Sequence, residues 1–109
     1  MPISGSTTVS KETLQETLDT NNQGAITTSL EIGSLNMVGL YVSNDSGSHV
    51  SHVVTLQISP DDVEWFDTEH KVTGIGNVHD AKCACLYVRA IVETAEGSAS
   101  SSKINLMTS

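Results

Sequence analysis

Short stretches of alternating apolar and polar residues run through most of the chain. In the most regular one, Val50–Ser59, every second residue from Val50 to Ile58 is apolar or histidine, so these side chains would share one face of an extended strand. In Lys82–Glu93 the alternate residues from Ala84 to Val92 form an uninterrupted apolar face. The complete pattern predicts strands at Ala25–Ile32, Met37–Ser43, Val50–Ser59, Glu64–His70, Val72–Val78, Lys82–Glu93 and Ser100–Met107.

The connections between these strands are short and rich in turn-forming residues. Asn44–Ser48, Pro60–Asp62 and Ala95–Ser98 are too short to hold crossover helices, so we expect antiparallel pairing. Seven or eight such strands predict an all-β fold in the form of an antiparallel two-sheet sandwich. An immunoglobulin-like and a jelly-roll strand order both satisfy the alternation, and the pattern leaves both open.

The N-terminal part of the chain has a weaker pattern. Met1–Ser10 is small and polar, without periodic apolar positions. In Ser10–Asp19, Leu14 and Leu18 are four residues apart, as on a helix, whereas the threonines favour an extended strand, so both forms stay open. A length of 109 residues is typical of one domain. We therefore predict a partly extended N-terminal arm over residues 1–20 and a single β-sandwich domain over residues 21–109.

The composition supports a folded β domain and excludes some partners. Hydrophobic residues make up 38% and charged residues 17%, and the 27 serines and threonines suit strands and turns. With a formal net charge of −8 and five basic residues, the chain is a poor ligand for nucleic acid. No apolar run approaches the roughly 20 residues of a membrane span, and the N-terminus lacks the features of a secretion signal. We therefore expect a protein made in a cytosol, without a membrane or nucleic acid partner.

The histidines and cysteines are the candidates for chemistry. His49 and His52 would diverge to opposite faces of a strand, and a histidine at the core-facing position of His52 is more often a hydrogen-bonded core residue than a ligand. Cys83 and Cys85, too far apart on a strand for an unstrained disulfide, are interpreted as free thiols. A zinc site formed by these two with His79 is a weaker alternative. No catalytic motif is present, so we expect no enzyme activity, cofactor or metal.

The aromatic residues are better candidates for a protein-contact surface. Trp65 and Phe66 are adjacent on a predicted strand, so one should fill the core and the other should face outward; the core is the favoured place for Trp65. Tyr41 and Tyr87 fall opposite the apolar faces of their strands. The candidate contact residues are Tyr41, Trp65, Tyr87 and Arg89.

Two resemblances add to this interpretation. Ser59–Trp65 resembles the Ser-Pro-Asp-Gly-x-x-Trp hairpin of discoidin-like and other β-sandwich modules, although Asp62 stands where the glycine is usual. More broadly, the segments LEIGSLNMVGLYVSND, VVTLQISPDDVEWFDT and YVRAIVETAEGSASSSKINL, within Ile26–Met107, are similar to small structural proteins of tailed phages, in particular capsid decoration or cement proteins.

The phage resemblance implies a function. It implies a non-enzymatic protein of the virion, made in the host cytoplasm, that stabilises the phage head by binding the major capsid protein or other virion proteins. It also implies a homo-oligomer, with trimers as a common form. A neck or tail component is the nearest alternative. A carbohydrate-binding module on a fibre is another, and it would use an exposed Trp65, Tyr41 and the acidic hairpin around Asp61.

Overall fold

The computed structural model describes residues 12–32, 37–82 and 86–108 and contains no helix in these ranges. Accordingly, none of the described residues belongs to a helix long and apolar enough to cross a membrane. The described chain forms eight strands: β1 (Glu12–Asp19), β2 (Leu30–Glu31), β3 (Met37–Gly47), β4 (Val53–Ser59), β5 (Phe66–Thr73), β6 (Gly76–Lys82), β7 (Tyr87–Thr94) and β8 (Ser100–Thr108).

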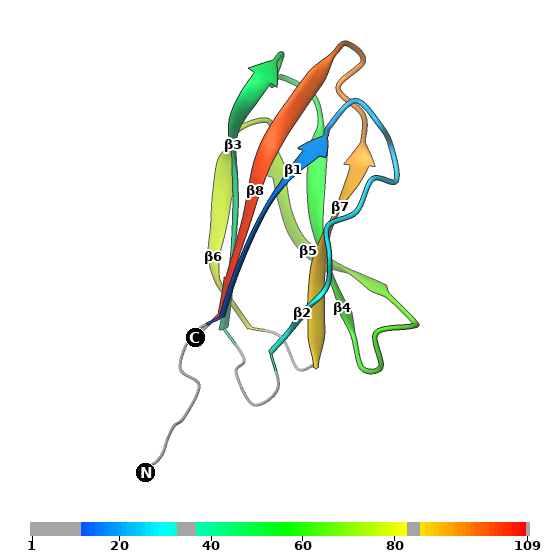
Figure 1. The fold of residues 1–109 in the computed structure, drawn as a ribbon, viewed down its shortest axis with the longest axis vertical. Coiled ribbons are helices and arrows are strands. Elements are labelled where there is room, and N and C mark those ends of the chain that lie inside the picture. Colours follow the sequence, from blue (N-terminus) through cyan, green and yellow to red (C-terminus); the bar gives the residue numbers. More distant parts are fainter. Residues whose placement is uncertain (1–11, 33–36, 83–85, 109) are drawn as a thin grey trace.

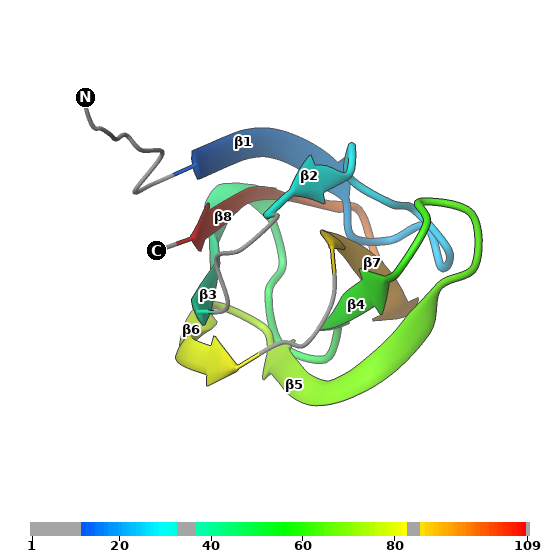
Figure 2. The ribbon, with the colours of Figure 1, turned by 90° about the horizontal axis from the view of Figure 1, so that it is seen from below.

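The strands form two antiparallel four-stranded sheets that enclose one core (Figures 1 and 2). One sheet has the order β1-β8-β3-β6 and the other the order β2-β7-β4-β5. The antiparallel pairs are nested within one another along the chain: β1 with β8, β2 with β7, β3 with β6, and β4 with β5. This is the jelly-roll order. The prediction of an all-β, antiparallel two-sheet sandwich is confirmed, and the strand order selects the jelly roll from the two alternatives.

The core is built by the predicted alternation. Val54 and Leu56 of β4 and Val88, Ala90 and Val92 of β7 are fully buried. Each buried Val or Leu side chain contributes about 1.5 to 3 kcal/mol to stability relative to an exposed one. β4 lies between β7 and β5 inside its sheet, as its regular pattern suggests. The opposite sheet supplies the other half of the core: Leu18, Val38, Leu40, Val42, Ala81, Ile104 and Leu106.

The predicted domain boundary at residue 20 does not match the sheet. β1 is an edge strand that pairs with β8 along its whole length, from Glu12 opposite Thr108 to Asp19 opposite Ser101. The segment left open between helix and strand is thus a strand, and residues 12–19 belong to the sandwich and not to an arm. Leu18 explains why, because its side chain is buried in the core. The remainder of the predicted arm, residues 1–11, lies outside the described residues.

Several predicted strand ends are also wrong. Val72–Val78 is not one strand, because Gly74, with a φ of 66°, turns the chain between β5 and β6. β4 begins at Val53 and β7 at Tyr87, so Val50 and Leu86 leave the core face and are 76% and 47% exposed. Within Ala25–Ile32 only Leu30–Glu31 is a strand, with an isolated bridge from Ile26 to Ile91.

The strand β3 is longer than predicted because it follows β8 through the expected loop. Its last pairs are Ser46 with Ser101 and Gly47 with Ser100, after a bulge. Gly47 has a φ of 82°, and a Cβ there would lie 2.2 Å from the carbonyl oxygen of Ala99. Only glycine fits this close approach of two backbones. The extension brings the end of β3 beside the start of β8, where a polar network lies.

Candidate contact surface and polar network

The outer face of the β2-β7-β4-β5 sheet carries an arginine stacked on the single tryptophan. Arg89 is on β7, and Trp65 directly precedes β5 in the chain. The guanidinium carbon of Arg89 lies 4.2 Å from the centre of the Trp65 ring. This distance is typical of a cation–π contact. Both residues are half-buried. The pair spans the sheet, because β4 lies between the two strands.

Gln57 of β4 holds Arg89 in place. It lies opposite both Arg89 and Asp67 in the ladders. Arg89 Nε donates to Gln57 Oε1 over 2.8 Å, and Gln57 Nε2 donates to Asp67 Oδ1 over 2.7 Å. The amide group of Gln57 is therefore used on both sides, and the arginine is fixed before any partner binds. Burial lowers the pKa of Arg89, and the negative charge of Asp62 opposes this shift.

A second polar cluster lies further along the same face. Glu93 Oε1 accepts a hydrogen bond from Lys71 Nζ and another from Thr55 Oγ1, each over 2.7 Å. These two bonds hold the pKa of Glu93 below its ordinary value. The lysine and the glutamate are 44% and 37% exposed, so their ion pair adds little stability. The cluster nevertheless orders the side chains of this face.

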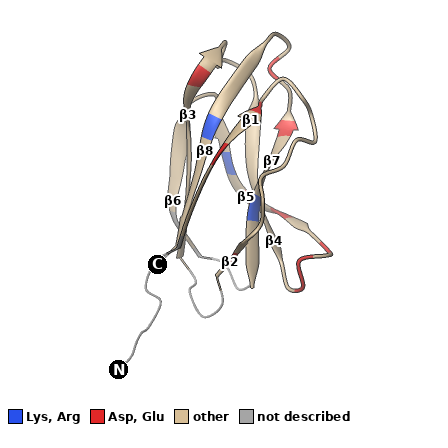
Figure 3. Cartoon of the chain, in the orientation of Figure 1, with Lys and Arg blue, Asp and Glu red and all other residues tan. Residues whose placement is uncertain are grey.

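The connection from β4 to β5 is a braced acidic hairpin. Ser59 Oγ accepts hydrogen bonds from the backbone N–H groups of Asp61 and Asp62, and Asp61 Oδ1 accepts those of Val63 and Glu64. The bonds from Glu64 and Val63 lower the pKa of Asp61. Asp62 adopts a φ of 64° at the position where the resembling hairpins carry glycine. Figure 3 shows acidic residues gathered along this hairpin.

The structure brings together three of the four predicted contact residues. Tyr87 and Arg89 belong to β7 of the β2-β7-β4-β5 sheet, with Tyr87 opposite Ser59 of β4, and Trp65 directly precedes β5 of the same sheet. Trp65 is not in the core, contrary to the favoured prediction, because it packs under Arg89 on the outer face. Phe66 is 53% exposed.

The fourth predicted contact residue, Tyr41, lies on the other sheet. It belongs to β3, where its ring covers Gly39: a Cβ on that glycine would meet Tyr41 Cε1 at 2.8 Å. Tyr41 and Trp65 therefore do not form one platform. This separation removes the geometric basis for a sugar-binding site built from both rings.

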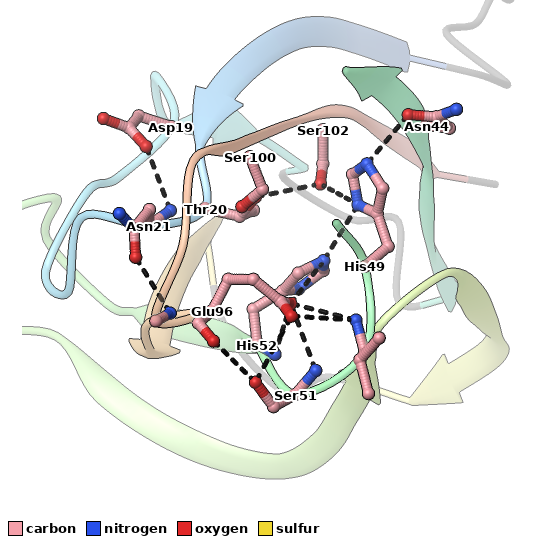
Figure 4. A network of polar contacts seen from close by, with 12 residues as sticks. Asp19, Thr20, Asn21, Asn44, His49, Ser51, His52, Glu96, Ser100 and Ser102 are labelled. Carbon is pink, nitrogen blue, oxygen red and sulfur yellow. Dashed lines mark hydrogen bonds and ion pairs between the residues drawn. The ribbon is translucent and has the colours of Figure 1, made fainter. Parts of the chain in front are cut away.

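A polar network joins four chain segments at the other end of the sandwich (Figure 4). At its centre the Glu96 carboxylate, from the β7–β8 loop, accepts the backbone N–H groups of Val50, Ser51 and His52. Burial alone would raise the pKa of Glu96, but these three bonds and the nearby His52 outweigh it, and the pKa is lowered. Glu96 N donates to the carbonyl of Thr20, so the loop is also tied to the end of β1.

The rings of the buried His52 and the half-buried His49 form the next part of the network. His52 Nε2 lies 3.1 Å from His49 Nδ1 and 4.0 Å from Glu96 Oε1. His49 Nε2 lies 3.1 Å from the carbonyl oxygen of Ser46. Because a carbonyl oxygen can only accept a hydrogen bond, Nε2 carries the proton when the His49 ring is neutral. His49 Nδ1 is then an acceptor, and His52 Nε2 donates to it.

This tautomer leaves one buried nitrogen without a partner. His52 is fully buried, and its Nδ1 has no hydrogen-bond partner among the described residues. Because Nε2 carries the proton, Nδ1 is an unprotonated acceptor. Burial lowers the pKa of His52, with the negative charge of Glu96 acting in the opposite direction and His49 adding to the decrease. His52 is therefore neutral at neutral pH.

Hydroxyl groups extend the network across the first sheet. Ser102 Oγ lies 3.2 Å from His49 Nδ1 and 3.2 Å from Thr20 Oγ1. Thr20 Oγ1 also lies 2.7 Å from Ser100 Oγ. All three hydroxyl residues are buried, so the network satisfies polar groups that would otherwise weaken this end of the core.

The sequence predicted only part of this network. His52 is a buried, hydrogen-bonded residue, as expected, but His49 does not diverge from it, because residues 48–52 form a loop and not a strand. The glycine and serines before His49 were the available signal for that loop. Nothing in the sequence indicates that Glu96 lies against this loop, since the two are 44 residues apart.

The described residues contain no group of three or more His, Cys, Asp and Glu side chains arranged to hold a metal ion. Cys83 and Cys85, interpreted as free thiols, lie outside the described residues, as does any site they would form with His79.

Comparison with known proteins gives one fold likeness. The chain matches no family model and no curated protein sequence. Its structure is similar to the crystal structure of the SPBc2 prophage-derived protein YomS, with a TM-score of 0.58 over 90% of this chain and 93% of that chain. The sequence identity is 10%, so the likeness concerns the fold alone. The likeness extends over nearly the whole of both chains.

Proposed function

We propose that this chain is a non-enzymatic structural protein of a phage particle and that it works by binding other virion proteins. The fold likeness to a prophage-derived protein over nearly the full length of both chains supports this proposal. Jelly rolls are also frequent in viral coat proteins. A fold does not determine a function, so the proposal depends on a site that suits protein binding.

The Arg89–Trp65 pair is the observation that carries the proposal. Arginine and aromatic side chains are enriched at the energetic centres of protein interfaces. Here both are half-buried, and Gln57 fixes Arg89 in advance, which reduces the entropy lost on binding. Tyr87 and the acidic hairpin flank the pair on the same sheet. The outer face of the β2-β7-β4-β5 sheet is therefore the proposed contact surface.

Within the particle, capsid decoration is the proposed role and the major capsid protein the proposed partner. A net charge of −8 favours a basic partner surface. Many copies on a lattice turn individually weak contacts into tight attachment. The resemblance to decoration proteins supports self-association, with a trimer as the proposed form. In the alternative role, as a neck or tail component, the chain would bind its partner through the same contact surface.

The test is to purify particles of the phage or prophage that carries the gene and to measure this chain relative to the major capsid protein by quantitative mass spectrometry. The expected result is a fixed, high copy number for the natural chain. Arg89→Glu should reduce that number strongly, whereas the matched charge reversal Lys103→Glu, on the other sheet, should not. Purified particles without the chain would contradict the proposal.

A further inference from the structure

We propose that His49 and His52 form an acid-sensitive latch, which holds the loops at one end of the sandwich together and releases them when the pair takes up a proton. This inference is independent of the proposed function. It depends on the geometry of the network in Figure 4.

The latch joins segments that are distant in sequence. His49 and His52 lie between β3 and β4, Glu96 lies between β7 and β8, and Thr20 follows β1. The segment after β3 is attached mainly to one side chain, because its N–H groups at Val50, Ser51 and His52 all donate to Glu96. The carbonyl of His52 also accepts the N–H of Gly74, in the β5–β6 turn. Four connections at this end therefore meet around one histidine pair.

With both rings neutral, every proton in the pair has an acceptor. His49 Nε2 donates to the Ser46 carbonyl, with Asn44 Oδ1 also 2.8 Å away, and His52 Nε2 donates to His49 Nδ1. Ser102 Oγ completes the site by donating to the same Nδ1.

An added proton breaks this arrangement wherever it binds. On His49 Nδ1 it faces the N–H of His52 at 3.1 Å, so two donors oppose each other. Moving the His52 proton to Nδ1 relieves that conflict but places an N–H where no described residue accepts it. Protonation of His52 itself creates the same buried N–H. A buried donor without an acceptor destabilises the folded arrangement, because it has lost its hydrogen bond to water.

The charges around the pair do not compensate for this conflict. Glu96 is the carboxylate that faces His52, at 4.0 Å, and it is already used by the three loop amides. β8 and the end of β1 present the hydroxyls of Ser100, Ser102 and Thr20, and the β5–β6 turn presents the backbone of Gly74. Asp19 and Asp45 lie at the edge of the network and accept from Asn21 N and Ser101 Oγ.

Release should be local because the rest of the sandwich has its own support. Val54 and Leu56, two and four residues after His52, are buried between the sheets. Their strand pairs with β5 and β7 independently of Glu96. Acid would therefore open the loops at this end while the strands stay paired.

The experiment is amide hydrogen exchange by NMR on the full chain at several values between about pH 7.5 and about pH 5.0, expressed as protection factors. The amides of Val50, Ser51 and His52 should lose protection by up to about tenfold per pH unit, as expected for the uptake of one proton. The amides of Ile32 and Leu86 should keep theirs, because they donate to Leu86 O and to Ser59 O, at the end of β4 that is distant from His52.

Variants separate the latch from a general effect of acid. His52→Gln keeps a donor toward His49 and cannot titrate, and its amide can also turn its oxygen toward a proton on His49 Nδ1, so the pH dependence of the loop amides should disappear. The matched control His70→Gln, on β5, should retain it. If His52→Gln does not fold, the ring ¹⁵N signals of the natural chain give a second readout: His52 should titrate over the same pH range in which the loop amides lose protection. Unchanged loop protection, simultaneous loss in every strand, or different pH ranges for ring and amides would overturn the proposal.

Discussion

Arg89 lies with its guanidinium carbon 4.2 Å from the centre of the Trp65 ring, although Arg89 is on β7, Trp65 directly precedes β5, and β4 lies between these two strands. One face of the only tryptophan is thereby shielded from water. The contact makes tryptophan fluorescence a direct reporter of the proposed contact surface.

The first prediction concerns this shielding. Arg89→Ala should shift the emission maximum of Trp65 to longer wavelength, because the ring becomes more exposed, and should cost about 0.5 to 1 kcal/mol of stability. Fluorescence spectra and urea unfolding measure both effects. Lys103→Ala, on the other sheet, is the control and should leave the spectrum unchanged. An unshifted spectrum for Arg89→Ala would mean that the stacking is absent in solution.

The second prediction concerns the close approach of β3 and β8. Gly47 and Gly97 both have a positive φ, but a Cβ at Gly97 would meet nothing within 4 Å, whereas one at Gly47 would collide with Ala99. Gly97→Ala should cost about 1 to 2 kcal/mol from the left-handed backbone conformation alone. Gly47→Ala should cost clearly more. Thermal or urea unfolding compares the two, and equal losses would contradict the backbone contact.

The third prediction concerns pH. The pKa of His52 in the folded protein lies below its ordinary value of 6.5, so the unfolded chain binds more protons below that value. The contribution of neutral His52 to the free energy of unfolding should therefore be fully present above about pH 6.5. It should decrease as the pH falls toward the pKa of His52 in the folded protein. The lowered pKa of Glu96, with an ordinary value of 4.5, adds a further loss at more acidic pH. Urea midpoints against pH test this, and His52→Gln should flatten the first decrease. A midpoint that rises between pH 6.5 and pH 5 would show the opposite sign.

The fourth prediction concerns Glu96. Glu96→Gln removes the charge and one acceptor oxygen from the three loop amides, so it should lower the unfolding midpoint and speed exchange at Val50 and Ser51. Glu69→Gln, at an exposed position of β5, is the matched control and should change little. If both variants behave alike, the carboxylate does not hold the loop.

The sequence predicted the core better than it predicted the ends of strands. Val54, Leu56, Val88 and Leu106 are buried where the alternation places them, because side-chain direction in a strand has a strict period of two. Val50 and Leu86 continue the same pattern but are exposed, since the strands begin after them. Alternation shows which residues would share a face and does not show where pairing starts.

The candidate site was less predictable for a similar reason. Tyr87 and Arg89 share a face of β7 and were found from their spacing. The stacking of Arg89 on Trp65 depends on which strands are neighbours, and several strand orders satisfy the same alternation. The contact of Glu96 with His52 depends in addition on how two loops fold, which leaves no periodic signal.

The most direct test of the contact surface is hydroxyl-radical footprinting of the free chain and of the chain bound to purified particles. Trp65 and Tyr87 lie on the proposed contact sheet, and Tyr41 and the 42% exposed Met107 lie on the other. All four side chains oxidise readily. The account predicts that binding protects Trp65 and Tyr87 while Tyr41 and Met107 stay reactive. Protection of Tyr41 and Met107 alone, or a chain that does not bind particles at all, would contradict it.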